Sequence, residues 1–153
     1  MANLVATISE SVTINGALRG STNTLTVTDI TDTFERTVTC PHSNITTIAS
    51  FNSSVAGSAG NMNLDLENTK YIRVTNTSAT AVCDLAVIEE TGVYTVVLTA
   101  GASHILCQAD TAVFAEDDST TPAFPTLKDI TSIQVKPRGA TDNANVEIFV
   151  GVV

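Results

Sequence analysis

The sequence predicts an all-β fold, either a sandwich or a barrel, and three observations lead to this expectation. Short runs that alternate apolar and polar residues follow one another between Lys70 and Gln108, and again near the end of the chain. Turn-forming residues divide these runs at an even spacing that is typical of sandwiches and barrels. Charged residues make up only 15% of the chain, and much of their place is taken by threonine, whose branched Cβ suits a strand.

Length and charge limit what the chain can be. At 153 residues it fits one domain, 1–153, large enough to bury roughly two-thirds of the surface that its unfolded form exposes. The net charge of −9 opposes contact with phosphate backbones and anionic lipids, so we expect neither nucleic acid nor a membrane as partner. Because the first residues lack a basic region and an apolar core of signal-peptide length, we expect folding in a cytoplasm.

The first 20 residues are expected to form an N-terminal arm or hairpin. Residues 3–8 can form a strand or an ordered arm. Asn15-Gly16 is the strongest hairpin signal in the chain, because both residues accept the positive φ of a two-residue turn. Residues 24–28 then alternate as a half-exposed strand.

Residues 29–36 are predicted to form a short turn or a single helical turn, because Ile30 and Phe34 are four residues apart. A strand at 37–40 follows and ends at Pro41. Residues 43–63 indicate a strand and then a long loop, 52–60, which is either an interaction site or a disordered segment.

The centre of the chain predicts four strands, at 71–75, 82–88, 93–99 and 103–108. The first two are separated by the polar segment 76–80, so a hairpin is the simplest expectation. The third strand is apolar on both faces, which predicts a central position in its sheet.

The last part of the chain predicts a short strand at 112–115, an acidic loop at 116–122 and a single turn at 126–130. Two further strands follow. Their inward rows are expected to contain Ile133 and Val135 in the first, and Val146, Ile148, Val150 and Val152 in the second.

Cysteine and histidine give the one candidate metal site. Cys40 and His42, with His104 and Cys107, supply the ligand types of a structural zinc site. However, His104 and Cys107 are three apart on a predicted strand and so project to opposite faces. We expect instead that Cys40, Cys83 and Cys107 are buried free thiols and that the histidines lie on the surface, with no metal or other cofactor.

Carboxylates and nucleophiles give no clear site. The acidic pairs are Glu89-Glu90, Asp29 with Asp32, and Asp65 with Glu67, and the acidic loop adds residues 116–118. None has the spacing of an EF-hand, and a solvated loop is favoured over a calcium site. No serine or cysteine stands in a motif that would join it to a histidine and an orienting group, so we expect no enzyme.

Several segments resemble small virion structural proteins of tailed bacteriophages, especially capsid decoration or cement proteins. These segments are SVTINGALRGS at 11–21, KYIRVTNTS at 70–78, YTVVLTAGASHILCQ at 94–108 and DITSIQVKPRGATDNANVEIFVGVV at 129–153. The resemblance implies an antiparallel β-sandwich of jelly-roll type. It also implies a homo-oligomer, commonly a trimer, that is assembled in the host cytoplasm and binds the major capsid protein on the outer surface of the virion head.

Two segments are candidates for docking to the shell. They are the N-terminal arm, with Met1, Asn3, Leu4 and Val5, and the long loop, with Asn52, Val55, Gly57 and Gly60. The alternative is a receptor- or carbohydrate-binding sandwich from a tail or head fibre or an adhesin. The absence of tryptophan weakens the carbohydrate alternative, because sugar rings usually stack on exposed aromatic rings, and the seven aromatics, five Phe and two Tyr, mostly fit inward rows.

Overall fold

The computed structural model describes residues 2–52, 63–109 and 126–153, and every regular element in this part of the chain is a strand. The strands form two larger sheets and two short two-stranded ones. Neighbouring strands are antiparallel except for one parallel pair, β6 with β7. The expectation of an all-β, antiparallel fold is confirmed.

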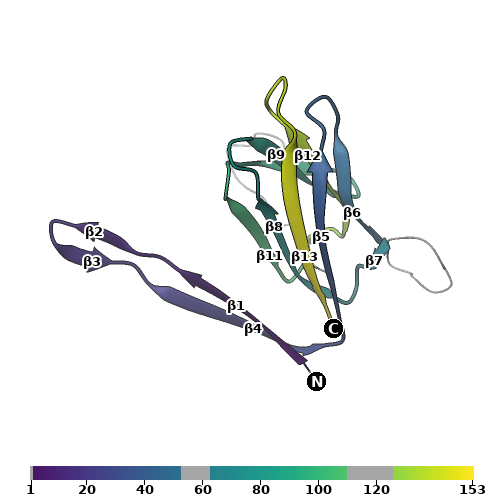
Figure 1. Ribbon diagram of the computed structural model, residues 1–153. Coiled ribbons are helices and arrows are strands. Elements are labelled where there is room, and N and C mark those ends of the chain that lie inside the picture. Colours follow the sequence, from purple (N-terminus) through teal and green to yellow (C-terminus); the bar gives the residue numbers. More distant parts are fainter. Residues whose placement is uncertain (1, 53–62, 110–125) are drawn as a thin grey trace.

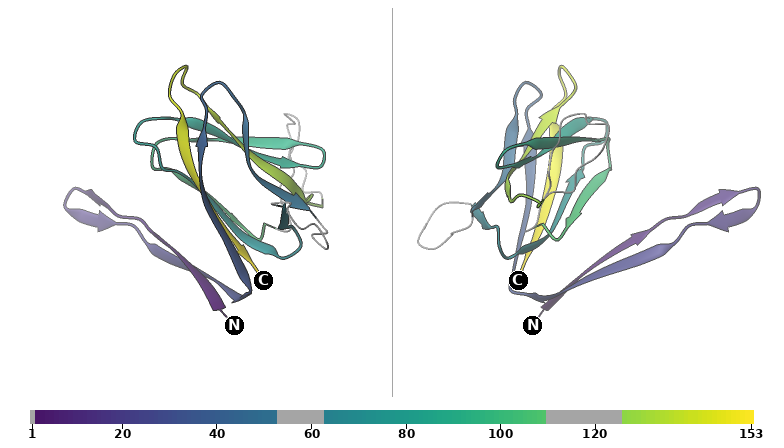
Figure 2. Two further views of the ribbon diagram at one scale, coloured as in Figure 1. Left: turned by 45° about the vertical axis from the view of Figure 1, so that its right-hand side comes forward. Right: turned by 180° about the vertical axis from the view of Figure 1, so that it is seen from behind.

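The two larger sheets together are called the body, and they face each other as two layers (Figure 1, Figure 2). In spatial order, one sheet contains β10 (Val93–Leu98), β9 (Cys83–Glu89), β12 (Ile130–Pro137), β6 (Thr46–Asn52) and β7 (Asn63–Asp65). The other contains β11 (Ser103–Cys107), β8 (Thr69–Asn76), β13 (Ala144–Val152) and β5 (Asp32–Cys40).

Aliphatic rows from both sheets meet in one core. On β13 the predicted inward row is confirmed, because Val146, Ile148 and Val150 are fully buried and Val152 packs against the same core. Ile133 and Val135 on β12 are buried as well. On β9 the buried row is Cys83, Leu85 and Val87. Alternate residues of each strand therefore fill the space between the sheets, as the period of two requires.

Two expectations about strand pairing are wrong. The strands at 71–75 and 82–88 do not form a hairpin, because β8 pairs with β11 and β13 while β9 lies in the other sheet. The strand at 93–99 is not central, since β10 is the edge of its sheet and Val93 and Val97 are 51% and 46% exposed. Alternation along one strand reports which face is buried and carries no information about the partner strand.

Two predicted turns are also wrong. Residues 29–36 contain the end of β4 and the start of β5, and Phe34 pairs with Val150 across the ladder to β13. The four-residue spacing of Ile30 and Phe34 also matches the period of a strand, because residues i and i+4 share one face of it. Residues 126–129 form no turn, and Ile130 begins β12 directly.

An N-terminal β-ribbon, residues 2–30, projects away from the body (Figure 1, Figure 2) and is called the arm. Its root pairs β1 (Ala2–Ser9) with β4 (Thr22–Ile30), and its tip, residues 12–19, pairs β2 (Val12–Ile14) with β3 (Ala17–Arg19). The predicted turn is confirmed, since Asn15 and Gly16 have φ values of 51° and 77°. The ribbon runs to Ile30, beyond the first 20 residues in which it was expected.

Asn76 connects the turns at one end of the body. It is fully buried, and its Nδ2 donates hydrogen bonds to the carbonyl oxygens of Ala81 (2.8 Å) and Leu98 (3.0 Å). Its Oδ1 accepts a hydrogen bond from the Ser78 N–H at 3.1 Å. One amide side chain therefore joins the β8–β9 connection to the end of β10, and so links the two sheets.

Replacing Asn76 by Ala leaves two buried carbonyl oxygens and one N–H without this partner. Each lost partner costs about 1–3 kcal/mol, so we expect Asn76→Ala to lower the free energy of unfolding by about 3 kcal/mol or more. Urea unfolding followed by circular dichroism measures this. Asn23→Ala is the matched control, because Asn23 is exposed and its amide bonds only the Ser21 hydroxyl. Equal, small effects of both variants would contradict the role given to Asn76.

Candidate interaction surface

The arm has two chemically different faces. Residues opposite each other in an antiparallel pair share a face, and Leu4 lies opposite Val27 while Ala6 lies opposite Leu25. The other face is lined with hydroxyls, where Thr7 contacts Thr24 at 3.4 Å and Ser9 contacts Thr22 at 3.0 Å between their oxygens. The root is therefore a ribbon with one apolar face and one hydroxyl-rich face.

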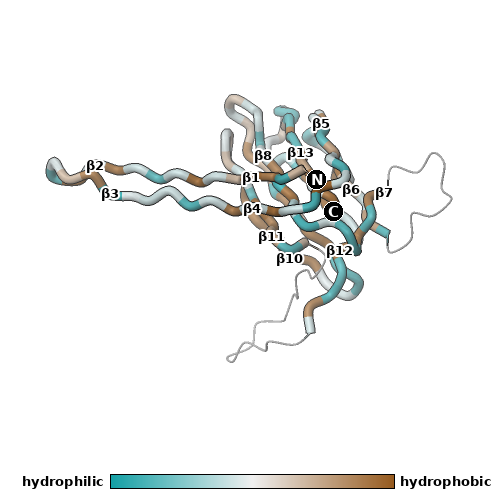
Figure 3. Tube along the Cα trace, turned by 90° about the horizontal axis from the view of Figure 1, so that it is seen from below, coloured by the Kyte–Doolittle hydropathy of each residue, from teal (hydrophilic) through white to brown (hydrophobic). Residues whose placement is uncertain are grey.

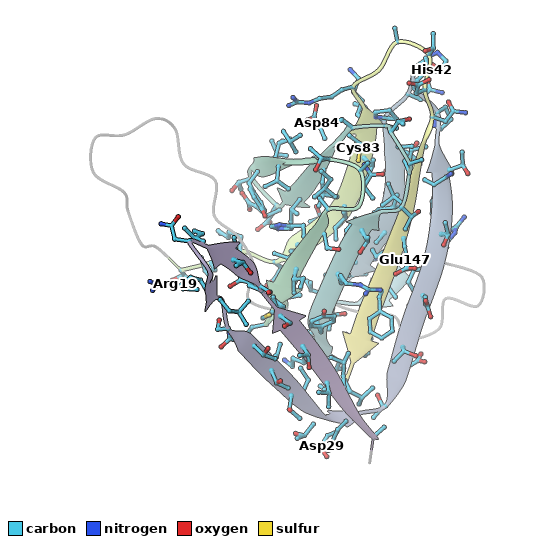
Figure 4. All side chains as sticks on the ribbon, turned by 60° about the vertical axis from the view of Figure 1, so that its left-hand side comes forward. Arg19, Asp29, His42, Cys83, Asp84 and Glu147 are labelled. Carbon is cyan, nitrogen blue, oxygen red and sulfur yellow. The ribbon has the colours of Figure 1, made fainter. Side chains whose placement is uncertain are left out.

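The root of the arm is fixed to the body at Gly151. A Cβ added to Gly151 would lie 2.8 Å from Leu4 Cδ1 and 3.4 Å from Ile30 Cδ1, so glycine permits the close approach of both side chains. The Thr31 N–H donates a hydrogen bond to the Val152 carbonyl oxygen at 2.9 Å. Asp29, with a left-handed φ of 64°, lies at this junction (Figure 4).

A groove separates the apolar face of the arm from the outer face of the sheet that contains β8 and β13. Its volume is about 580 Å³, and its lining includes Ile8 from the arm and Tyr71, Ile105 and Phe149 from the sheet. A smaller hollow of about 180 Å³ has Ile8, Tyr71 and Ile105 in common with it and adds Leu25 and Cys107. The two hollows together are called the groove, and both of its walls are mainly apolar.

Aromatic and charged side chains form the floor of the groove. The Tyr71 and Phe149 rings meet edge to face, with centroids 6.2 Å apart. The Arg73 guanidinium lies 5.9 Å from the centroid of Phe149 and also pairs with the carboxylate of Glu147. Burial raises the pKa of the Tyr71 hydroxyl, against a smaller lowering by Arg73. The Glu147 carboxylate thus balances the charge of Arg73, and the Phe149 ring lies within range of a cation–π contact with it.

Exposed apolar side chains are concentrated on the arm. Of the ten large hydrophobic residues that are exposed in the described part of the chain, six belong to it: Val5, Ile8, Val12, Ile14, Leu18 and Leu25. Figure 3 shows apolar stretches along the ribbon. Exposed apolar patches of several hundred Å² are typical of interaction sites. Among the described residues, the arm is therefore the strongest candidate interaction surface.

Charged residues, unlike the exposed apolar ones, are concentrated outside the arm. Residues 2–28 contain only two charged residues, Glu10 and Arg19, so their net charge is zero, whereas the whole chain carries −9. Arg19 lies at the tip of the arm (Figure 4). The acidic character of the protein thus comes entirely from residues outside this stretch. Asp29, at the junction with the body, is the one other charged residue of the arm, so the arm is a charge-poor ribbon on an acidic body.

The docking candidates named from the sequence have different positions. Asn3 and Val5 are exposed on the arm, and Leu4 is half-buried against Gly151. Asn52 ends β6 in the other sheet, and Figure 1 shows neighbouring β7 on the side away from the arm. Met1, Val55, Gly57 and Gly60 lie outside the described residues, as do the strand expected at 112–115 and the loop at 116–122.

Sequence reasoning named Leu4 and Val5, which line the groove, but it missed the residues of the tip and of the sheet wall. Val12, Ile14 and Leu18 surround the Asn15-Gly16 turn, and Leu18 is 73% exposed. A signal was available in the sequence: these apolar residues lie on a short hairpin, and no neighbouring segment of the chain is expected to cover them. The alternation of β8 and β13 places Tyr71 and Phe149 on the outer face of the sheet, but it does not show that the arm lies over them.

The cysteine and histidine residues do not come together. Cys40 and His42 lie at the end of β5, whereas His104 and Cys107 lie on β11, which is the opposite edge of the same sheet. Cys40 and Cys83 are buried free thiols, but Cys107 is exposed, so the expectation of burial is wrong for Cys107. Cys107 is the last residue of β11, an edge strand that has only one neighbouring strand to cover it. The described residues contain no group of three His, Cys, Asp or Glu that could hold a metal ion.

The acidic residues close turns. Asp65 accepts hydrogen bonds from the Glu67 N–H (3.1 Å) and from Asn68 Nδ2 (2.8 Å). Glu89 is buried and accepts from the Thr91 N–H at 2.9 Å and the Thr91 hydroxyl at 3.0 Å. These carboxylates are therefore engaged with neighbouring backbone and side-chain donors. The acidic loop at 116–118 lies outside the described residues.

Comparison of the chain with protein-family models, curated proteins and solved structures gives no match. In the described part of the chain, no helix has the length and apolar character needed to span a membrane.

His104 is not on the surface as expected, and its burial has a consequence for pH. It is half-buried between β10 and β11, where its Nε2 contacts the Tyr94 hydroxyl and the two rings lie 5.6 Å apart. Burial lowers the pKa of His104 below its ordinary value of 6.5. An unprotonated Nε2 accepts a hydrogen bond from the Tyr94 hydroxyl, and protonation of Nε2 removes that acceptor.

Because the pKa of His104 is lower in the folded state, the unfolded chain takes up this proton first as the pH falls. The free energy of unfolding is therefore expected to be constant between about pH 7 and 8, below the range in which thiols titrate. It is expected to decrease between about pH 6.5 and 5.5, before carboxylates titrate. Urea titrations across this range measure the slope. We expect His104→Gln to reduce the slope and His42→Gln to retain it. An identical slope in both variants would show that His104 is not its source.

Proposed function

We propose that this chain is a non-enzymatic capsid decoration protein that binds the outer surface of a tailed-bacteriophage head as a homotrimer. The observation that carries the proposal is the arm, a charge-poor ribbon with exposed apolar residues that projects from an acidic body. An isolated two-stranded ribbon is only marginally stable in water. The arm therefore suits a protein whose working state is an assembly, in which other protein surfaces cover it.

The strand pairing of the body supports its assignment as a jelly roll. Apart from the short β7, the body has eight strands, and the first four pair with the last four in reverse order. The pairs are β5 with β13, β6 with β12, β8 with β11, and β9 with β10. Such pairing is that of one long antiparallel ribbon wound into two sheets. Jelly rolls of eight strands occur in viral capsid domains, lectins and cupins.

The core favours a structural role over binding of a small molecule between the sheets. Leu85, Ile133 and Ile148 are completely buried and fill the interior together with their aliphatic neighbours. The groove, with its volume of about 580 Å³, lies outside this core, against the arm. Surface contact is therefore favoured over an enclosed ligand.

The receptor- or carbohydrate-binding alternative has less support. Stacking on a sugar needs an aromatic face that solvent can reach. Tyr71 is only 4% exposed and lies beneath the arm, and Tyr94 is half-buried against His104. Neither tyrosine offers a free ring face, so the decoration role is preferred.

The mechanism of a decoration protein is mass action. A ligand that binds the assembled shell, and not its separated subunits, stabilises the shell by the free energy of that binding. Contact through hydroxyl-rich and apolar surfaces requires little desolvation of charge, and the exposed threonines of the arm and of β5 provide such a surface. The acidic body keeps the free protein soluble.

Co-expression of the chain with the major capsid protein encoded in the same genome tests the proposal. We expect the chain to sediment with the assembled shells, and we expect these shells to dissociate at a higher urea concentration than shells made without it. The quantities to measure are the amount of chain bound per shell and the urea midpoint of shell dissociation.

Failure of the chain to sediment with shells at about 10 μM would contradict this function, because a docking contact with a useful Kd saturates at that concentration. Binding of the free chain to a glycan array, lost in Tyr94→Ala without unfolding, would instead favour the carbohydrate-binding alternative.

A further inference from the structure

We propose that the groove is the docking site for the arm tip of a second copy of this chain, so that copies exchange arms around a closed ring. The inference deepens the homo-oligomer of the proposed function and rests on it, but it does not depend on binding to a shell. It names the two surfaces that meet: the tip, residues 12–19, and the groove between the arm root and the outer face of β8, β11 and β13.

The shape of the tip fits a groove with two apolar walls. Val12 and Ile14 lie on one face of the tip, opposite Arg19 and Ala17, whereas Leu18 lies on the other face with Thr13. Val12, Ile14 and Leu18 are 51%, 56% and 73% exposed. A ribbon that is apolar on both faces cannot be covered by one flat surface. It is covered when it enters between two apolar walls.

The groove provides those two walls. One wall is the arm root, with Ala6 and Ile8, and the other is the sheet, with Tyr71, Ile105 and Phe149. Leu4 fills the narrow end, where it meets Gly151. The root of the same arm is fixed at that end, so its own tip points away from the groove (Figure 1, Figure 2). The tip that enters must therefore come from another copy.

Charge permits this contact between copies of an acidic protein. Each copy carries a net charge of −9, most of it on the body, so the bodies of two copies repel each other. The tip adds no negative charge, since its one charged residue is Arg19, and the charged groups on the groove floor are the paired Arg73 and Glu147. Bringing the tip into the groove thus places Arg19 near an ion pair whose charges balance. The two acidic bodies stay separated by the length of the arm, which limits their repulsion.

Exchange in both directions enlarges the interface. A specific interface buries at least about 1,000 Å² in total, and a tip that is enclosed on both faces buries more area than one that lies on a flat surface. Each copy gives one tip and accepts one, so each takes part in two such contacts. Because the tip and the groove are different surfaces, the contact is heterologous, and it forms a ring when the rotation between neighbouring copies closes. The trimer of the proposed function is such a ring.

The first experiment compares solution masses by light scattering after size exclusion. We expect the full chain to be an oligomer and Leu18→Asp to be a monomer of 16.0 kDa. Leu18 is too exposed for its replacement to unfold the body. Val97→Asp is the matched control, because Val97 is also an exposed strand residue but lies on β10, away from both surfaces, and it should retain the oligomer.

Mixing two defective variants distinguishes tip-to-groove contact from tip-to-tip contact. Leu18→Asp lacks a functional tip and Ile105→Asp lacks a functional groove, so each alone should be monomeric. Together they should form one-to-one pairs through the intact groove of the first and the intact tip of the second. Circular dichroism checks that Ile105→Asp is folded, since Ile105 is half-buried. Two folded monomers that stay separate on mixing would overturn the proposal.

Cys107 provides a second measurement that needs no groove variant. It is an exposed free thiol in the groove, whereas Cys40 and Cys83 are buried. Burial raises the pKa of the Cys83 thiol to about 11 and also raises that of Cys40, so neither competes for a thiol reagent. We expect Cys107 to react at least about tenfold more slowly in the oligomer than in Leu18→Asp, because the tip covers it.

Three results would overturn the exchange of arms. They are an oligomer that Val97→Asp dissociates and Leu18→Asp does not, equal reactivity of Cys107 in both states, and a monomeric full chain. If the monomeric chain binds shells and Leu18→Asp abolishes that binding, the tip contacts the shell instead. An oligomer with exchanged arms that does not bind shells would leave this inference standing and remove the capsid function.

Discussion

The burial of aliphatic rows between the two facing sheets is the constraint on which the rest of this structure depends. A shift of one residue along any strand would exchange its buried and exposed faces, so each inward row also fixes the outward row. On β8, burial of Ile72 and Val74 turns Tyr71 and Arg73 outward, and on β13 burial of Ile148 does the same for Phe149. The floor of the groove is thus a direct consequence of the core.

The arm depends on the body at one place. Leu4 and Ile30 reach the sheet because Gly151 has no side chain, and the hydrogen bond from the Thr31 N–H to the Val152 carbonyl oxygen continues the contact. From there the ribbon leaves the sheet and keeps its apolar face directed towards it. The groove is the space between these two surfaces, and it exists because the arm is fixed at its root and unsupported along its length.

Apolar surface and charge are divided between the two parts of the molecule. The body buries its apolar residues and carries most of the net charge of −9, whereas the arm exposes apolar residues and has only three charged ones, Glu10, Arg19 and Asp29. A charged body resists unspecific association, and a charge-poor ribbon favours association at one surface. This division is the physical basis for the proposal that the chain works in an assembly.

The sequence by itself determined the features that depend on neighbouring residues. The all-β class, the turn at Asn15-Gly16 and the inward row from Val146 to Val150 follow from local periodicity and from the φ values that glycine and asparagine accept. Only the tertiary structure decided which strands pair. The strand at 71–75 pairs with 103–107 and not with 82–88, and the apolar strand at 93–98 lies at an edge. Pairing between distant strands depends on how the whole chain crosses between the sheets, which alternation within one strand does not record. For the same reason the exposure of Cys107 and the position of the groove appear only when the arm and the sheet are placed together.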